Sequence, residues 1–557
     1  MDSESTIRVE IEGRAPVSIA RGKTLLELKS ILGAPEDPLV PIVGALCNNR
    51  VMGLEYPIVR NCRVRFYTTG DEEGTEIYRR SLSVLLHAAF IDLAAKGEAL
   101  KIEHSLNRGY FYSYVDKKPL TAERVREIES RMRELIERNI PFDKCEFERE
   151  DALDLFRQIG AWDRHYLLKY SDRSKAILYR LGGCINLAQG PLVPATGYLK
   201  LFSLVHFPPG LVLVFPEAED PAILPSRVEQ KKLFQVYSEH REWSKILDVG
   251  SAGKLNRLIV KGKIDDLIWV SEGLHEKKIA QIADVITHNA KTRRIVLLAG
   301  PSSSGKTTFA KRLTIQLLAN GIGPVVVSLD NYYLPRERIP RSGNHLDLES
   351  LYALDVELIN RHLRELLEGE KVSIPRYDFK TGMSEKEAEE IRLRKNQILI
   401  IEGIHGLNEE LTREIGRDEK FKIYISALTQ LNLDYINRIP TSTVRLLRRI
   451  VRDHQFRAYT ARQTLSQWPQ VRAGEGKHIF PFQEAADIMF NSSLVYEMPV
   501  LKLYVESLLK DIEENDVMYT QAKRLLHFTS NFLDITSDHV PITSILREFI
   551  GGSGFEY

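Results

Sequence analysis

The spacing of hydrophobic positions divides the first half of the chain into two kinds of structure. In residues 1–70 the runs TIRVEIEG and CRVRFYTT alternate apolar and polar positions, as strands do, and TLLELKSIL between them has helical spacing. From Gly74 to about Glu217 strand-like and helical patterns are mixed. We therefore expect a small β-rich unit followed by an α+β unit.

One amphipathic helix is predicted over residues 121–139. Thr121 suits the start of a helix, and charges fill the positions outside one apolar stripe. The stripe contains Val125, Ile128, Met132 and Leu135. Around residues 226–290 the chain becomes charged and helical, which is typical of a connector between two halves.

After Arg294 short apolar runs alternate with helical segments. The runs IVLLAG, PVVVSLD, ILIIEG and FKIYIS are apolar on both faces, as strands are when helices cover both sides of a parallel sheet. Residues 355–369 form one covering helix, which ends at Gly369. The end of the chain has a further helical stripe, which predicts that this segment docks on another part of the protein: Ile542, Ile545, Leu546 and Phe549.

Composition narrows the function classes. A chain of 557 residues is too long for one core, so two to four domains are expected. The 77 Lys and Arg residues balance 76 Asp and Glu residues, so no overall basic charge indicates nucleic-acid binding. The four cysteines form no CxxC pair, and the apolar runs are too short to span a membrane. A polar, acidic N-terminus is no signal peptide, so we expect a soluble cytoplasmic protein without a membrane partner, for which an oligomer is possible.

The segment LLAGPSSSGKTTFAKRL contains the pattern GxxxxGK[ST] between a predicted strand and a predicted helix. Such glycines let backbone N–H groups converge on phosphates at a helix N-terminus, so we expect an ATP site here. Lys306 would neutralise the β- and γ-phosphates, and the Thr307 hydroxyl would bind Mg²⁺. A Gly/Ser-rich turn without a ligand is the alternative. The predicted nucleotide site comprises Gly300, Pro301, Ser302, Ser303, Ser304, Gly305, Lys306, Thr307 and Thr308.

Two acidic residues end the next predicted strands. Asp330 closes PVVVSLD and Glu402 closes ILIIEG, and ligands bind at the carboxyl ends of parallel strands. Phosphoryl transfer needs one carboxylate near Mg²⁺ and another to orient or deprotonate the attacking hydroxyl. A turn or cap role for Asp330 and a solvated strand end for Glu402 are the alternatives.

An arginine stripe lies in the segment VRLLRRIVRDHQFR. Arg445, then Arg448 or Arg449, and then Arg452 recur at helical steps. Arginines in this position suit a lid that closes over the phosphates during transfer. A solvated helix face is the alternative, because charge runs usually lie in water.

Together these motifs resemble the uridine kinase/phosphoribulokinase family over roughly residues 290–505. The resemblance implies a catalytic and Mg²⁺-side role for Asp330 in SLDNYY, a metal role for Glu402, and phosphate roles for Arg449 and Arg452. Its acceptor segment corresponds to IPRYDF at residues 374–379. The implied acceptor-binding residues are Asp330, Tyr332, Tyr377, Asp378 and Arg457.

The acceptor segment also departs from the family pattern. Uridine kinases follow Y-D-F with a histidine and an arginine, where this chain has Gly382 and Ser384. In the lid, Arg457 is retained, but Tyr459 stands where the second arginine of the pair is expected. The catalytic motifs therefore match better than the acceptor pocket.

The first half resembles threonyl-tRNA synthetase. Residues 5–70 are similar to a TGS domain of β-grasp fold, and residues 74–217 are similar to the synthetase's second additional domain, which edits mischarged tRNA. The four editing positions are occupied by Arg80, Val84, Ala188 and Leu192. His87 and Cys184 lie nearby at the wrong spacing, so we expect the fold without editing or metal chemistry.

These inferences predict a multidomain α/β and α+β protein. Its expected parts are a TGS-like β-grasp domain (1–72), a synthetase-like domain (73–225), a helical connector (226–288), a P-loop kinase domain (289–505) and a C-terminal helical segment (506–557). The expected activity is ATP- and Mg²⁺-dependent phosphorylation of the 5′-hydroxyl of uridine or cytidine. A kinase acting on another small alcohol and a nucleotide-switched protein that binds RNA or ribosomes are the alternatives.

Overall fold

The N-terminal unit consists of a five-stranded sheet with one helix packed on it. The computed structural model describes residues 6–33, 37–106, 108–115, 118–226, 228–342, 345–378 and 381–556. The first sheet has the order β2-β1-β5-β3-β4, and its strands span Val17–Ala20, Thr6–Ile11, Cys62–Thr68, Ile42–Cys47 and Arg50–Met52. Helix α1 (Leu25–Ile31) packs on it through Leu25 and Leu28. The strands and the helix predicted in residues 1–70 are confirmed.

The second unit is α+β. One sheet has the order β11-β12-β7-β6 (Ser203–Phe207, Gly210–Val214, Gly109–Tyr114, Leu100–Leu106), and a second has the order β10-β9-β8 (Cys184–Leu187, Lys175–Leu181, Asp143–Glu148). Its helices are α2 (Glu72–Leu93), α3 (Ala122–Glu137), α4 (Arg149–Gln158) and α5 (Trp162–Lys169). All four predicted stripe residues of α3 are buried, and Thr121 caps its first turn, so the predicted helix is confirmed.

The charged middle segment forms α6 (Lys231–Ile246), α7 (Ala252–Val260) and α8 (Ile264–Asn289). Helix α8 is more than a connector because it packs along α9 (Lys306–Ala319) of the next unit. Arg312 of α9, 4% exposed, is paired with Glu276 at 2.7 Å and Glu272 at 3.3 Å. None of the helices within the described ranges combines the length and apolar character that a membrane span requires.

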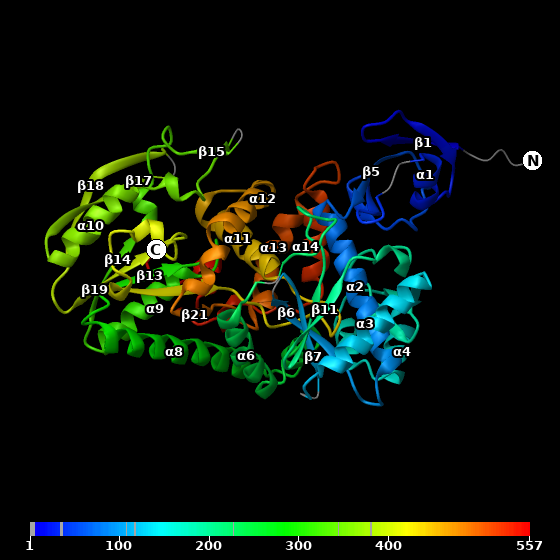
Figure 1. Ribbon diagram of the computed structural model, residues 1–557, viewed down its shortest axis with the longest axis horizontal. Coiled ribbons are helices and arrows are strands. Elements are labelled where there is room, and N and C mark those ends of the chain that lie inside the picture. The colour runs from blue at the N-terminus through cyan, green and yellow to red at the C-terminus, as the bar shows by residue number, and fades with distance from the viewer. Residues whose placement is uncertain are drawn as a thin grey trace, which may run out of the picture.

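A five-stranded parallel sheet forms the centre of the second half (Figure 1). Its order is β14-β19-β13-β20-β21, with strands Gly323–Ser328, Gln397–Glu402, Ile295–Ala299, Lys420–Ser426 and Ile488–Asn491. The four predicted runs are strands, whereas β21 was not predicted. Helix α10 (Val356–Glu368) ends at Gly369, in the left-handed conformation, as expected. The edge strand β14 is only partly covered, and Val326 is 47% exposed.

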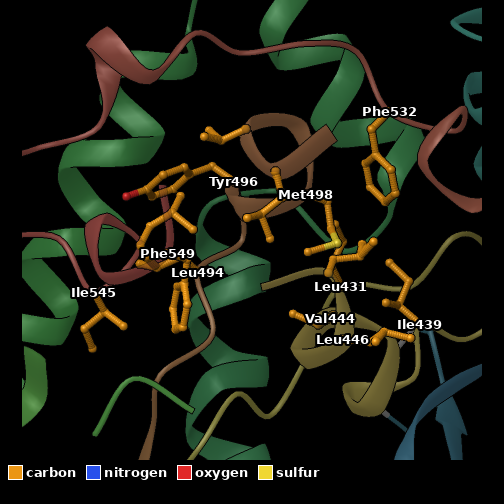
Figure 2. Close-up of a cluster of buried hydrophobic side chains, with 14 of the residues drawn as sticks. Leu431, Ile439, Val444, Leu446, Leu494, Tyr496, Met498, Phe532, Ile545 and Phe549 are labelled. Atoms are coloured by element: carbon orange, nitrogen blue, oxygen red, sulfur yellow. The ribbon is translucent and has the colours of Figure 1, made fainter. Parts of the chain in front are cut away.

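The C-terminal helices complete the same core. They are α11 (Thr441–Arg457), α12 (Ala461–His478), α13 (Glu497–Lys510), α14 (Tyr519–Thr529) and the short α15 (Arg547–Ile550). One buried cluster extends from α4 through the parallel sheet to Ile545 and Phe549, part of which Figure 2 shows. The tail is docked as predicted, although Ile542 of its stripe is 61% exposed. In Figure 1 the N-terminal sheet, labelled at β1 and β5, lies at one end of the molecule.

Candidate active site

The turn between β13 and α9 is built to approach phosphate. At Gly300 a Cβ would lie 2.0 Å from a carbonyl oxygen of β20, so only glycine fits. Gly305 has a φ of +84°, a left-handed conformation that glycine tolerates, and directly precedes α9. Lys306, Thr307 and Thr308 form the first turn of this helix, where backbone N–H groups without helical partners attract anions.

The loop interior is held by elements distant in sequence. The residues between the two glycines are Pro301, Ser302, Ser303 and Ser304. The N–H of Ser302 donates to Glu475 Oε1 of α12 at 3.1 Å, and the hydroxyl of Ser492 donates to the carbonyl of Ser304 at 2.5 Å. Ser303 is buried and has a φ of +58°. These contacts fix the loop before any ligand arrives.

Glu402 lies beside the first turn of α9. It ends β19, between β13 and β14, and its Oε1 accepts a hydrogen bond from Thr307 Oγ1 at 2.9 Å. Burial raises the pKa of the Glu402 carboxyl to about 7; Lys306 and Thr307 oppose the rise, and Glu548 adds to it. The structure therefore brings together two of the three predicted Mg²⁺-side residues, Thr307 and Glu402.

This raised pKa predicts a pH-dependent effect of Glu402→Gln on stability. The folded protein binds this proton more tightly than the unfolded chain, so the stabilisation is present at low pH and is lost as the pH rises through about 7. Relative to wild type, the variant should gain about 2 kcal/mol in the free energy of unfolding between pH 5 and pH 8.

Urea denaturation of both proteins at several pH values measures this difference. Glu357→Gln, which removes an exposed carboxylate from α10, should show no such trend. A constant difference between Glu402→Gln and wild type from pH 5 to pH 8 would contradict the assigned environment.

Asp330 lies in the short 3₁₀ helix Leu329–Tyr332 that follows β14. Its side chain is open to the crevice, and its N–H donates to Ser328 Oγ at 3.2 Å. The surrounding protein raises the pKa of the Asp330 carboxyl, while the charges of Lys306, Arg457 and Arg452 lower it. Three predicted cationic residues therefore surround the predicted base.

Lys306 is the cation shared by the acidic groups of the crevice. Its Nζ donates to the carbonyl of Pro301 at 3.3 Å. Burial lowers the pKa of the Lys306 ammonium, and the negative charges of Glu402, Glu548 and Asp330 act in the opposite direction. A bound phosphate would give the Lys306 ammonium a further anionic hydrogen-bond acceptor.

Helix α11 directs one set of arginines towards the loop and the crevice. Arg449 Nη1 donates to Ser302 Oγ at 2.9 Å, and its Nε donates to Asp453 at 3.1 Å. The fully buried Asp453 also pairs with Arg452 at 2.7 Å and lies 3.8 Å from Arg457. One carboxylate thus orients three guanidinium groups, including those near Asp330.

Two further arginines of α11 have a structural position. Arg445 is 1% exposed; it pairs with Glu475, and its Nε donates to the carbonyl of Ser302 at 2.9 Å. Arg448 is fully buried and its Nε donates to Glu497 at 2.6 Å. The stripe is therefore part of a packed helix that supports the phosphate loop, and only its C-terminal part faces the crevice.

The expected acceptor residues fall on two sides of the sheet edge. The Tyr332 ring is buried and its hydroxyl lies 3.1 Å from His362 Nδ1 of α10, so it points into the core. The next residue, Tyr333, packs on Tyr377 with ring centroids 5.5 Å apart, and the charge of Asp330 contributes to its raised pKa. Tyr333, and not Tyr332, is therefore the tyrosine that contacts Tyr377.

Tyr377 and Asp378 end β17 (Lys371–Asp378), which pairs with β18 (Met383–Arg392). The last residue of the Y-D-F segment, Phe379, lies outside the described residues. Gly382 has a φ of +74°, and its carbonyl accepts from the N–H of Arg336 at 3.1 Å. Arg336 also packs over Gly382, where a Cβ would lie 2.9 Å from its Nε, while Ser384 stands opposite Tyr377.

Three carboxylates near the loop escaped the sequence analysis. Glu475 accepts a hydrogen bond from the N–H of Ser302, and Glu548 accepts one from Thr308. Burial raises the pKa of the Glu349 carboxyl, and the positive charge of Arg449 opposes this rise. Glu475 and Glu548 are 173 and 240 residues from their partners, and no local pattern connects such positions.

The donor set fits Mg²⁺ bound together with phosphate. The Thr307 hydroxyl and Glu402 carboxylate adjoin each other, and Mg²⁺ usually takes one or two protein ligands, with phosphate oxygens and water completing its shell. Within the described part of the chain, no group of three or more His, Cys, Asp or Glu side chains is placed to hold a metal ion by itself.

The positions that correspond by resemblance to the editing residues of the synthetase are packed within the second unit. Val84 and Leu192 are buried in the core of the second unit, and Arg80 Nη1 donates to the carbonyl of Pro191 at 2.7 Å. His87 and Cys184 are also buried; burial lowers the pKa of His87 to about 3 and raises the pKa of the Cys184 thiol. His87 is therefore neutral at physiological pH.

Comparison with known proteins supports both halves of this description. Residues 295–497 match the model of the Phosphoribulokinase / Uridine kinase family. A threonine–tRNA ligase from Thermotoga maritima is 29% identical over 204 residues, which cover 36% of this chain and 30% of the ligase. The chain thus spans less than a third of the length of that relative.

Two solved structures are also similar to part of the chain. A possible uridine kinase from Bacillus stearothermophilus is 22% identical and covers 38% of this chain and 97% of its own, with a TM-score of 0.26. D-glycerate 3-kinase from Cryptococcus neoformans is 13% identical and covers 48% and 89%, with a TM-score of 0.21. By the family model, residues 295–497 form a phosphoribulokinase/uridine kinase family domain, and the N-terminal region is similar to threonine–tRNA ligases.

Proposed function

We propose that this protein transfers the γ-phosphoryl group of ATP to the 5′-hydroxyl of a pyrimidine nucleoside, uridine or cytidine. The convergence of Lys306, the Thr307–Glu402 pair and Asp330 at the carboxyl edge of the parallel sheet carries the proposal. A nucleotide switch needs the first two of these features. An exposed carboxylate facing them is what transfer to a hydroxyl additionally requires.

In the proposed reaction, the loop Gly300–Thr308 holds the triphosphate through its backbone N–H groups. Asp330 accepts the proton of the attacking hydroxyl, whose oxygen bonds to the γ-phosphorus as the bond to the β–γ bridging oxygen breaks and ADP leaves. Lys306, Arg449 and Arg452 stabilise the negative charge on the transferring group. When bound at Thr307 and Glu402, Mg²⁺ would neutralise charge on the phosphate oxygens.

The acceptor assignment rests on the aromatic pair and its neighbours. Tyr377, whose ring packs at a tilt of 44° against that of Tyr333, supplies an aromatic side chain for a base, and Asp378 and Arg457 supply polar groups for the sugar and the phosphate side. Arg336 at Gly382 supplies a cation near the turn where the family pattern has an arginine. Because this cation comes from another segment than the arginine of the family pattern, a second candidate function is the same phosphoryl transfer to another small alcohol.

We also propose that the division into residues 1–72, 73–225, 226–288, 289–505 and 506–557 reflects separate ancestral modules. Similarity to threonine–tRNA ligases supports an RNA contact through the first two. Burial would raise the pKa of Glu76, yet Arg79, Arg80 and Arg524 hold it below its ordinary value, so cations are concentrated here. This supports a switch that responds to RNA as the alternative function.

A panel of nucleosides and small alcohols tests the proposal. With ATP and Mg²⁺, ADP should form in proportion to added uridine or cytidine, and more slowly with purine nucleosides, glycerate or sugars. A rate of ADP formation that is unchanged by every nucleoside but increases with tRNA or ribosomes would favour the switch instead.

A further inference from the structure

The C-terminal segment Ser544–Ile550, which we term the plug, lies on the phosphate loop. The plug contains the short helix α15 and contacts the loop at Gly305 and Thr308. Ile545 and Phe549 are fully buried, and Figure 2 shows them in the cluster that contains Leu494 and Tyr496. The plug is therefore anchored by apolar side chains close to the site.

One carboxylate of the plug binds the first turn of α9. Glu548 Oε2 accepts hydrogen bonds from the N–H of Thr308 at 3.0 Å and from its hydroxyl at 2.8 Å. Ile545 reaches the other side of the same turn, because a Cβ on Gly305 would lie 2.4 Å from its Cγ2. Both contacts are made at the end of the loop that is proposed to hold the triphosphate.

Glu548 also acts on the charges of the crevice. Its negative charge raises the pKa of Glu402 and counteracts the lowered pKa of Lys306. A carboxylate at this place offers the loop what a phosphate oxygen would offer, namely a charged acceptor for N–H and hydroxyl groups. A triphosphate brought to the same donors would meet like charge, and the donors of Thr308 cannot serve both anions fully.

The plug is held independently of Glu548. The Phe549 ring lies 5.0 Å from the guanidinium of Arg448, and Arg547 donates to the carbonyls of Ser537 and Val540 at 2.8 and 2.6 Å. Removing the Glu548 carboxylate therefore leaves the apolar and backbone anchors in place. Point variants of this residue can report on competition without detaching the tail.

We propose that Glu548 is an internal competitor of the nucleotide, which occupies donors of the phosphate loop and has to leave Thr308 before ATP binds. The inference rests on the proposed function, because the displaced ligand is a nucleoside triphosphate. The observed association constant for ATP is then the intrinsic constant multiplied by the fraction of molecules in which Glu548 has withdrawn from Thr308. Any event that displaces the plug would activate the site.

Calorimetric titration of the full chain with a non-hydrolysable ATP analogue and excess Mg²⁺ tests this competition. Glu548→Gln and Glu548→Ala should bind about ten-fold more tightly than wild type, because the charged acceptor is gone. The matched control is Glu556→Gln, which removes an exposed carboxylate of the same tail and should leave Kd unchanged. Should Glu548→Ala melt early, the near-isosteric glutamine variant decides.

The outcomes separate this inference from the proposed function. An equal or higher Kd in both Glu548 variants overturns the competition, including the case in which Glu548 binds Mg²⁺, and leaves the kinase proposal standing. Tighter binding without phosphorylation of any nucleoside supports the competition and overturns the nucleoside kinase. If neither wild type nor the variants bind the analogue, both proposals are wrong.

Discussion

Replacing Asp330 by asparagine should lower kcat for phosphoryl transfer by roughly 10²–10⁴-fold. The asparagine keeps the size of the side chain but cannot accept the proton of the attacking hydroxyl. The fold should be unaffected, because Asp330 is exposed and only its backbone N–H makes the local bond to Ser328. Steady-state rates with saturating ATP and acceptor, combined with thermal melting, measure both effects.

The matched control for this variant is Asp418→Asn. Asp418 is exposed and lies in the 3₁₀ helix Arg417–Glu419 that precedes β20, at the opposite edge of the sheet from the carboxyl ends of the strands. Its replacement should leave kcat unchanged. Full activity of Asp330→Asn would show that another group, such as Glu349, accepts the proton.

The second large effect is on stability, and it separates two arginines of one helix. Arg448→Met should lower the free energy of unfolding by about 3–5 kcal/mol, because it leaves the buried Glu497 without its cation. Arg452→Met should cost about 1 kcal/mol or less in stability, since Asp453 retains Arg449 and Arg457 nearby. The kcat of this variant should nevertheless fall by roughly 10²-fold, because Arg452 is proposed to stabilise the charge on the transferring group.

Denaturation curves and steady-state kinetics of the two variants measure this contrast. The double variant Arg448→Met/Glu497→Met should recover much of the lost stability, because both buried charges are then removed. If Arg448→Met melts like wild type but loses activity, the assignment of Arg448 as a structural residue is wrong.

Much of the kinase-like half could be predicted from its sequence because each signal is local. A buried strand, a glycine-rich turn and a helix follow one another within residues 295–319, and parallel strands bring their carboxyl ends to one edge whatever the loops between them do. Asp330 and Glu402 could therefore be assigned to the same crevice. The hydrogen bond between Thr307 and Glu402 shows that Glu402 lies beside the first turn of α9.

What could not be predicted depends on packing between distant segments. The adjacent residues Arg448 and Arg449 carry the same charge on one helix, and only the position of Glu497 on α13 and of Ser302 on the loop distinguishes them. Tyr332 and Tyr333 differ in the same way, because the hydroxyl of Tyr332 lies beside His362 of α10 whereas that of Tyr333 donates to the carbonyl of Leu348. Local spacing carries no information on such partners.

The plug illustrates the same limit. Its apolar stripe predicted that the tail docks, but a stripe does not say where it docks. Glu548 became informative only when folding brought it to Thr308, 240 residues away in sequence. Carboxylates that bind P-loop donors across such separations are found from structure alone.

The most direct test of the central claim is to follow the γ-phosphorus of ATP by ³¹P NMR during turnover with uridine and Mg²⁺. The account predicts that its resonance is replaced by that of a nucleoside 5′-monophosphate, in equal amount to the ADP formed, and that Asp330→Asn slows this conversion by roughly 10²–10⁴-fold. Appearance of inorganic phosphate alone, with uridine unchanged in both the wild type and Glu548→Gln, would contradict it.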